Sequence, residues 1–229
     1  MTAAAAGLAI FVKTPGYSPL KTRLAQAIGR DAAEAFHRLA AAAVADVVMQ
    51  AQATLPGLVA YWAVAEADAV DAPVWHGLPR IAQGEGDLGA RMRHVCDVLR
   101  ERHGRVVLIG ADAPQLCADD LIAACTALDA HDSVIGPSAD GGFWLFGTRT
   151  AVPDVAWRDT PWSQADTASR FVHTLGAASM TSLRLLRDVD TVDDLVALAD
   201  TLHDVPTPTP TQAALALWLR DLSLRPEDV

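Results

Sequence analysis

The sequence is poor in cysteine, and this shortage argues against two classes of protein. Its 229 residues include three cysteines, Cys96, Cys117 and Cys125, with no Cys-x-x-Cys pair. An odd count without paired spacing argues against a disulfide framework and leaves too few soft ligands for a zinc site. We expect all three to be small buried residues in a reducing compartment, and we therefore expect a cytoplasmic protein.

Basic residues and long apolar runs are also scarce. Lys and Arg total 18 against 28 Asp and Glu, so the net charge is −10. Broad contact with a nucleic-acid backbone needs clustered Lys and Arg, so no nucleic-acid partner is expected. The apolar stretch from Thr2 to Val12 is shorter than the roughly 20 residues that span a bilayer. It also lacks the positive region and cleavage site of a signal peptide, so no membrane partner is expected.

Several catalytic signatures are absent. There is no Gly-x-Ser-x-Gly elbow, which argues against a serine hydrolase of the α/β class. The seven histidines show no His-x-x-x-His spacing, and we expect His37 and His94, both in predicted helices, to be surface or rim residues. A P-loop is incomplete, because proline and leucine stand at its two glycine positions ahead of the Lys21-Thr22 pair.

What the sequence does contain is an alternation of strand and helix patterns in a composition typical of globular proteins, 51% hydrophobic and 20% charged. This alternation predicts an α/β sandwich with a mostly parallel sheet. A loop with Trp and Pro is expected near 153–162. Strands are predicted at 7–12, 58–64, 105–109, 133–135, 143–146 and near 179–183, and helices at 31–52, from Asp87, at 118–128, through Phe171 and at 191–202.

The length favours one ample domain. We assign residues 1–203 to that domain. Residues 204–229 would form a Pro-rich connector, with Val205 to Pro210 extended, and a C-terminal helix that packs on the same domain.

In parallel α/β folds, ligands bind beyond the carboxyl ends of the strands, so the loops there are the candidate sites. The loop after the first strand carries Lys13, Lys21 and Arg23, whose charges suit a nucleotide diphosphate. A solvated basic turn explains them equally well. Asp112 follows the buried strand 105–109 and is the best single candidate ligand for Mg²⁺, although it could instead cap the next turn.

Further candidates lie in later loops. Asp140 precedes the Gly141-Gly142 pair and could orient a sugar hydroxyl or an attacking group, while the glycines let the backbone approach a ligand or simply make a turn. Asp188 and Asp190 point the same way if their segment is extended, and so could meet one cation.

A glycine-rich segment, Gln83 to Gly89, leads into the helix that begins at Asp87. Gln83, Gly86 and Asp87 could contact a nucleobase or ribose. An ordinary capped helix start accounts for the same residues.

Taken together and in order, five segments resemble a bacterial family of unknown function whose members look like GT-A-type glycosyltransferases, some of them named for arsenosugar biosynthesis. The segments are FVKTPGYSPLKTRLA, QGEGDLGARM, VVLIGADAPQL, VIGPSADGGFWLFG and DVDTVDDL, and the resemblance runs from Leu8 to about Leu198.

This resemblance implies a single-domain nucleotide-diphospho-sugar transferase fold, a three-layer α/β/α sandwich with a mixed, mostly parallel sheet. It implies that Lys13, Lys21 and Arg23 hold the phosphates and that Asp112 binds the metal, with Asp190 as a second acidic ligand. Asp140, Gly141 and Gly142 would line the sugar or acceptor side, with Asp112 and Asp140 as the catalytic residues.

The leading hypothesis is metal-assisted glycosyl transfer from a nucleotide-sugar to a small-molecule acceptor, with Mg²⁺ or Mn²⁺ as cofactor. The alternative is nucleotidyl transfer from a nucleoside triphosphate to a phosphorylated metabolite, with release of pyrophosphate. A third hypothesis is a non-catalytic nucleotide-binding protein. We also expect that two copies could pair as a homodimer.

Overall fold

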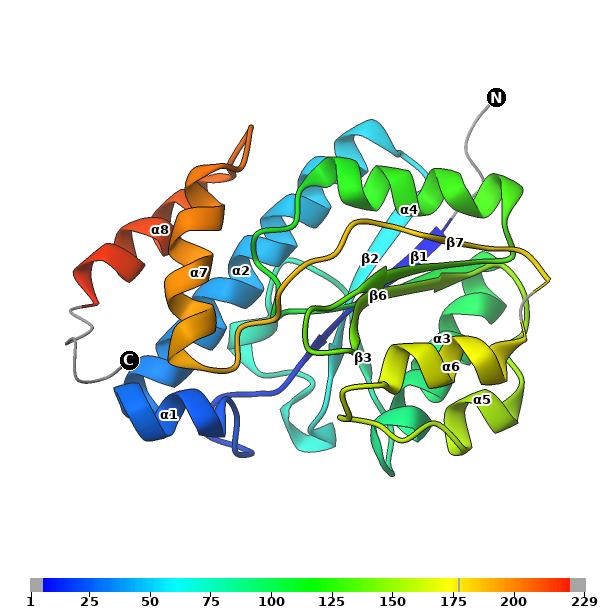
Figure 1. Ribbon diagram of the computed structural model, residues 1–229, viewed down its shortest axis with the longest axis horizontal. Helices are drawn as coiled ribbons and strands as arrows, with labels where there is room; N and C mark the ends of the chain where they lie inside the picture. Colours follow the sequence, from blue (N-terminus) through cyan, green and yellow to red (C-terminus); the bar gives the residue numbers. More distant parts are fainter. Residues whose placement is uncertain (1–5, 177, 223–229) are drawn as a thin grey trace.

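The computed structural model describes residues 6–176 and 178–222, and one seven-stranded sheet forms its centre (Figure 1). The strands pair in the order β3-β2-β1-β4-β6-β5-β7. β6 runs antiparallel to β4 and β5, and the other pairs are parallel. The bounds are β1 Ala6–Val12, β2 Leu58–Val64, β3 Arg80–Ala82, β4 Arg105–Gly110, β5 Ser133–Pro137, β6 Phe143–Thr148 and β7 Met180–Ser182.

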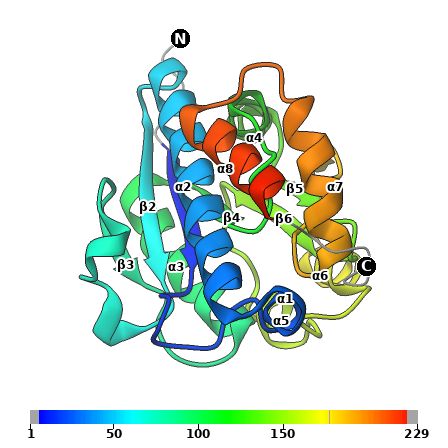
Figure 2. The same cartoon turned by 90° about the vertical axis from the view of Figure 1, so that its left-hand side faces the viewer.

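Helices cover both faces of this sheet (Figures 1 and 2). α2 and α4 pack on one face, and α3, α5 and α6 pack on the other. The bounds are α1 Thr22–Ile28, α2 Arg30–Thr54, α3 Leu88–His103, α4 Ala118–Ala130, α5 Asp154–Arg158, α6 Thr167–Leu175, α7 Val192–His203 and α8 Pro210–Asp221. The predicted three-layer fold with a mixed, mostly parallel sheet is therefore confirmed.

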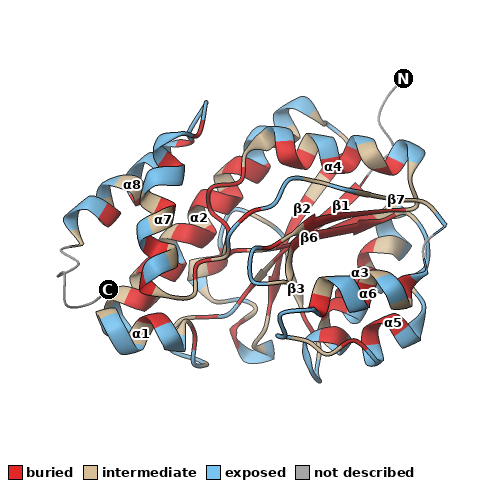
Figure 3. Ribbon diagram, in the orientation of Figure 1, coloured by how far each residue is buried: buried red, intermediate tan, exposed pale blue. Residues whose placement is uncertain are grey.

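Successive side chains of β1 alternate between two apolar cores, one on each face of the sheet. Leu8 and Ile10 belong to the core beneath α2 and α4, whereas Ala9 belongs to the core beneath α3, α5 and α6. Side chains of a strand point alternately to its two faces, so a central strand that is covered on both sides must be apolar throughout. Figure 3 shows the resulting run of buried residues along the central strands.

The C-terminal helices form a third apolar cluster with α1 and α2. α8 packs on α2 and α7 packs on α8, away from α3, α5 and α6 (Figure 1). Thr191 caps α7, as expected, by accepting a hydrogen bond from the Asp194 amide. Pro210, expected in the extended connector, is instead the first residue of α8, a position where its missing N–H costs nothing.

Three elements differ from the sequence prediction. The expected loop near 153–162 contains α5, a five-residue helix whose Trp157 is buried against β6 and α6. α1 and the three-residue strand β3 were not predicted as separate elements, because neither is long enough to show a clear apolar period. Among the described residues, no helix combines the length and apolarity needed to cross a bilayer.

Candidate active site

A pocket of about 560 Å³ opens at the carboxyl end of the parallel strands. The loops after β1, β3 and β4 line it, together with the β5–β6 turn, the segment from Trp162 to Gln164, and the segment from Asp188 to Asp190. All of these segments meet at one edge because β6, running antiparallel, begins where β4 ends. The fold thus brings together side chains that lie far apart in the sequence.

Lys21 is the central cation of this pocket. Its side chain is only 4% exposed, and its Nζ lies 2.8 Å from Asp112 Oδ1 and 3.0 Å from Asp190 Oδ1. Nζ also donates to the main-chain oxygen of Val189 at 2.6 Å. The three protons of the ammonium therefore meet three oxygens.

The backbone of Lys21 is unusual as well. It caps α1 in the left-handed region, at φ 46° and ψ 43°. A residue with a Cβ adopts this conformation at a cost of the order of 1–3 kcal/mol, and such strain concentrates at functional sites. This backbone conformation places the ammonium between the carboxylates of Asp112 and Asp190.

Charge pairing determines the ionisation of Lys21 and Asp112. Burial lowers the pKa of Lys21, but Asp112 and Asp190 outweigh burial and raise it above its ordinary value. Burial raises the pKa of Asp112, and the charge of Lys21 more than reverses this, so the pKa lies below its ordinary value. The Asp112 carboxylate and the Lys21 ammonium are therefore both charged at neutral pH.

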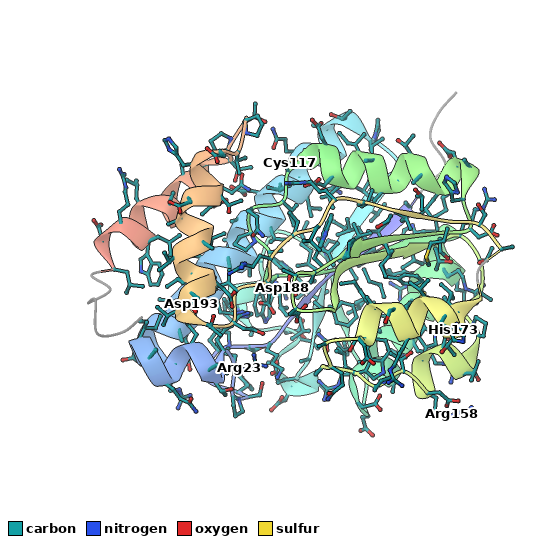
Figure 4. The ribbon with its side chains drawn as sticks, viewed as in Figure 1. Arg23, Cys117, Arg158, His173, Asp188 and Asp193 are labelled. Atoms are coloured by element: carbon teal, nitrogen blue, oxygen red, sulfur yellow. The ribbon has the colours of Figure 1, made fainter. Side chains whose placement is uncertain are left out.

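Asp188 is a third acid, beside the two ion pairs of Lys21 and near the middle of the molecule in Figure 4. Its Oδ2 accepts a hydrogen bond from Ser138 Oγ at 3.1 Å, while its Oδ1 is buried without a partner. Burial, and then the charges of Asp112 and Asp140, raise the pKa of Asp188 to about 7. A buried oxygen left unpaired in a pocket is available to a ligand.

Polar contacts hold the surrounding loops in place. The Thr14 amide donates to Glu66 Oε2 at 2.8 Å, and the Ser18 hydroxyl donates to the other oxygen of Glu66. The side-chain amide of Gln83 donates to the main-chain oxygens of Val12 and Ala63, at 3.2 and 2.9 Å. Gln83 lines the pocket, as expected, but its two N–H groups tie β1 to β2.

The structure brings most of the predicted site residues to the pocket: Lys13, Lys21, Gln83, Asp112, Asp140, Gly142 and Asp190. Arg23 is exposed on α1 and lies outside the lining residues (Figure 4). Gly86 and Asp87 also lie outside, since Asp87 caps α3 by accepting from the Ala90 amide at 2.8 Å. Gly141 packs against the main chain of Ala165 rather than lining the pocket.

Other residues at the pocket were not among the predicted site residues. His37, expected at the surface or rim, is 5% exposed and lines the pocket. Its Nε2 donates to the main-chain oxygen of Lys13 at 2.9 Å, and burial lowers its pKa, so it is neutral. Its spacing from Ala33 and Ala40, both buried on α2, was the available signal. In the segment from Trp162 to Gln164 the available signal was Trp162 itself, because a tryptophan in a loop can cover a ligand as well as pack locally.

A divalent cation fits the two paired carboxylates. One nitrogen lies within 3.0 Å of oxygens from both Asp112 and Asp190, so one ion could span them. Carboxylate oxygens are the ligands that Mg²⁺ and Mn²⁺ prefer. Within the described residues no three His, Cys, Asp or Glu side chains form a metal cluster. Substrate phosphates and water would have to complete the coordination of such an ion.

These features define an α/β protein with the fold of nucleotide-diphospho-sugar transferases and cytidylyltransferases. More particularly, the chain belongs to the family described as "Uncharacterized protein conserved in bacteria (DUF2064)", whose model matches residues 44–164. No curated protein matches the chain.

Solved structures extend the comparison. A protein from Desulfovibrio desulfuricans G20, provisionally described as a nucleotide-diphospho-sugar transferase, is 28% identical, with a TM-score of 0.79 over 96% of this chain and 98% of that one. Rv0371c from Mycobacterium tuberculosis H37Rv, crystallised with manganese, is 18% identical, with a TM-score of 0.51 over 85% of this chain and 97% of its own. CMP:2-keto-3-deoxy-manno-octonic acid synthetase, complexed with CTP, is 12% identical, with a TM-score of 0.51 over 88% and 99%. The last two likenesses show the fold alone.

Proposed function

We propose that this protein transfers a sugar from a nucleotide-sugar to a small acceptor, assisted by a divalent cation. The observation that carries the proposal is the placement of Lys21, buried between Asp112 and Asp190 in a pocket at the carboxyl edge of the sheet. The likeness to the Desulfovibrio protein, over nearly the whole of both chains, supports a nucleotide-sugar as the donor.

The charged end of the pocket suits a diphosphate. Lys13 and Lys21 line it and both come from the loop between β1 and α1. Cations from one loop can neutralise much of the charge of a nucleoside diphosphate. Lys21 would contribute to phosphate binding only by giving up its carboxylate partners, and an incoming metal ion on those partners would make that exchange favourable.

Asp112 and Asp190 would hold the metal ion, which as a Lewis acid stabilises negative charge on the departing phosphate oxygens. Asp112 suits this role because its carboxylate is ionised at neutral pH and its side chain is 42% exposed toward the pocket. His37, neutral and hydrogen-bonded to the main chain of Lys13, would hold the phosphate-binding loop in position.

The transfer step joins the acceptor to the sugar. An acceptor hydroxyl oxygen forms a bond to the anomeric carbon, and the bond from that carbon to the β-phosphate oxygen breaks. The electron pair leaves with the nucleoside diphosphate, and the hydroxyl proton passes to a carboxylate or to water. Asp140 lines the pocket, with its Oδ1 held by the Gly142 amide at 2.9 Å, and would orient the acceptor hydroxyl.

Product analysis tests the proposal. The protein would be incubated with Mn²⁺ and a panel of nucleotide-sugars, chosen by the rise in melting temperature that each one causes. We expect nucleoside diphosphate to be released, and the release to stop in Asp112→Asn. Asp193→Asn, an exposed acid in the first turn of α7, serves as the matched control. Pyrophosphate release from a nucleoside triphosphate would instead establish nucleotidyl transfer, and nucleotide binding without turnover would establish a non-catalytic role.

A further inference from the structure

The part of the pocket that α3, β6 and the segment before α6 line has a different chemistry, and it bears on the second substrate. Its lining includes a set that we call the acceptor wall. These residues are Leu88 and Met92 of α3, Phe143 of β6, and Trp162, Ser163 and Gln164 from the segment before α6. The acceptor wall is mainly apolar, whereas the loop after β1 supplies Lys13 and Lys21, with Lys21 paired to Asp112 and Asp190.

The acceptor wall is built rigidly. Trp162 Nε1 donates to the Trp157 main-chain oxygen at 3.0 Å, and the Trp162 ring meets Phe143 edge-on, with 6.2 Å between ring centroids. Trp162 also packs directly on Gly89, where a Cβ atom would lie 2.3 Å from its Nε1. Such close support fixes the orientation of the indole beside the pocket.

Backbone strain marks the same place. Ser163 has φ 61°, and within residues 6–176 and 178–222 the other non-glycine residue with positive φ is Lys21. Both line the pocket. Strained conformations persist where the surrounding structure holds them, and they cluster at ligand sites. This pattern indicates that the acceptor wall contacts a ligand.

The apolar surface in this wall is partly open. Leu88, the first residue of α3, is 43% exposed although it lines the pocket, and Ser163 and Gln164 are exposed as well. A ligand with an apolar face and hydroxyl groups would cover Leu88 and Phe143 with that face, and its hydroxyl groups would reach the polar groups of Ser163 and Gln164.

The charge beside this wall is negative. Asp140 lines the pocket and stands three residues before Phe143 of the acceptor wall. Among the described lining residues, the lysines are Lys13 and Lys21, both from the loop after β1, and none is an arginine. A phosphate group on the second substrate would meet a carboxylate here without a matching cation.

We propose that the acceptor wall binds the second substrate, and that this substrate is a hydroxylated compound with an apolar face and no phosphate group. The inference rests on the proposed glycosyl transfer, since it identifies the class of acceptor. It separates that reaction from nucleotidyl transfer to a phosphorylated metabolite, because such a metabolite would need cations at the acceptor wall.

A matched pair of probes tests the class of acceptor directly. Phenyl β-glucoside and its 6-phosphate share an apolar ring and hydroxyl groups and differ in charge. Their affinities would be measured calorimetrically, with and without the nucleoside diphosphate that stabilises the protein most. We expect the glucoside to bind, and we expect the affinity of its 6-phosphate to be lower by a factor of at least about ten. Equal or tighter binding of the phosphate, or no binding of either probe, would overturn the inference.

Variants then locate the binding. Gln164→Lys adds a cation to the acceptor wall and should narrow the difference between the probes, whereas Gln26→Lys, on exposed α1, should not. Trp162→Leu should lower the affinity for the glucoside and leave the affinity for the nucleotide unchanged. If Trp162→Leu lowers the affinity for the nucleotide instead, the acceptor wall holds the nucleobase and the inference is wrong. Gln164→Lys keeps the test valid should Trp162→Leu not fold.

The two proposals fail in different ways. Absence of nucleotide binding in the wild-type protein refutes the proposed function, whatever the probes do. Normal nucleotide binding and nucleoside diphosphate release, combined with a preference for the phosphorylated probe, refutes only the assignment of the acceptor.

Discussion

Replacing Lys21 by methionine removes the ammonium from between two carboxylates with little change in shape. In the wild-type protein, Nζ lies 2.8 Å from Asp112 and 3.0 Å from Asp190. Removing one partner of a fully buried ion pair costs about 3–5 kcal/mol. Here both carboxylates are 42% exposed, so water solvates them in part. We therefore expect Lys21→Met to lower the free energy of unfolding by about 1–2 kcal/mol at pH 7.

The loss should depend on pH in a defined direction. The folded-state pKa of Asp112 lies below its ordinary value because of Lys21, so its contribution is present above the unfolded pKa of about 3.9 and is lost as pH falls through the folded value. The folded-state pKa of Lys21 is raised, so its contribution is lost as pH rises through that value, above about 10.4. The difference in the free energy of unfolding between wild type and variant should thus be largest between about pH 5 and pH 10.

Urea and thermal denaturation would measure the effect, which corresponds to a fall of about 2–8 °C in melting temperature for a chain of this size. Lys13→Met removes the same charge from an exposed side chain of the same loop and should change stability by less than about 0.5 kcal/mol. Mn²⁺ should bind Lys21→Met more tightly than wild type in the absence of nucleotide, because it takes the place of the ammonium. A variant as stable as wild type at pH 7, or one with weaker Mn²⁺ binding, would refute this reasoning.

Three further predictions concern the rest of the pocket. Asp112→Asn should weaken Mn²⁺-dependent nucleotide binding about tenfold or more in calorimetric titrations, and unchanged affinity would exclude it as a ligand. Asp188 has a folded-state pKa of about 7, above its unfolded value, so its contribution to stability should fall as pH rises from about 4 to 7; the difference in unfolding free energy between wild type and Asp188→Asn should change accordingly over this range, and identical pH profiles in urea denaturation would contradict it. Gly89→Ala places a Cβ 2.3 Å from Trp162 Nε1 and should destabilise the protein by about 2 kcal/mol or more, whereas Ala90→Ser, at an exposed position, should not.

The central strands and the loops that follow them could be predicted from the sequence, because their signals are local. β1 and β4 are short apolar runs, Lys13 follows β1 directly, and Asp112 is the second residue after β4. Parallel strands bring such loops to one edge of the sheet, which is why Lys21 and Asp112 could be expected to share a pocket. The fold class therefore predicts that the side chains of Lys21 and Asp112 lie close together.

The remaining features depend on contacts between distant segments. α5 is too short to form by its own propensity, and the packing of Trp157 against β6 and α6 stabilises it. Trp162 and Ser163 reach the pocket because α5 and α6 pack on α3, an arrangement that a loop sequence does not encode locally. Asp87 looked equally suitable as a ligand contact or a helix cap, and the geometry of the α3 start makes it the cap.

A crystal structure of the protein with a nucleotide-sugar and Mn²⁺ would test most directly whether Lys21, Asp112 and Asp190 form the donor site. We expect the diphosphate to lie between the loop that carries Lys13 and Lys21 and the carboxylates of Asp112 and Asp190, with the Lys21 ammonium moved from the carboxylates to a phosphate oxygen. A nucleotide bound elsewhere, or Lys21 still paired with both acids and no metal ion on them, would contradict this assignment.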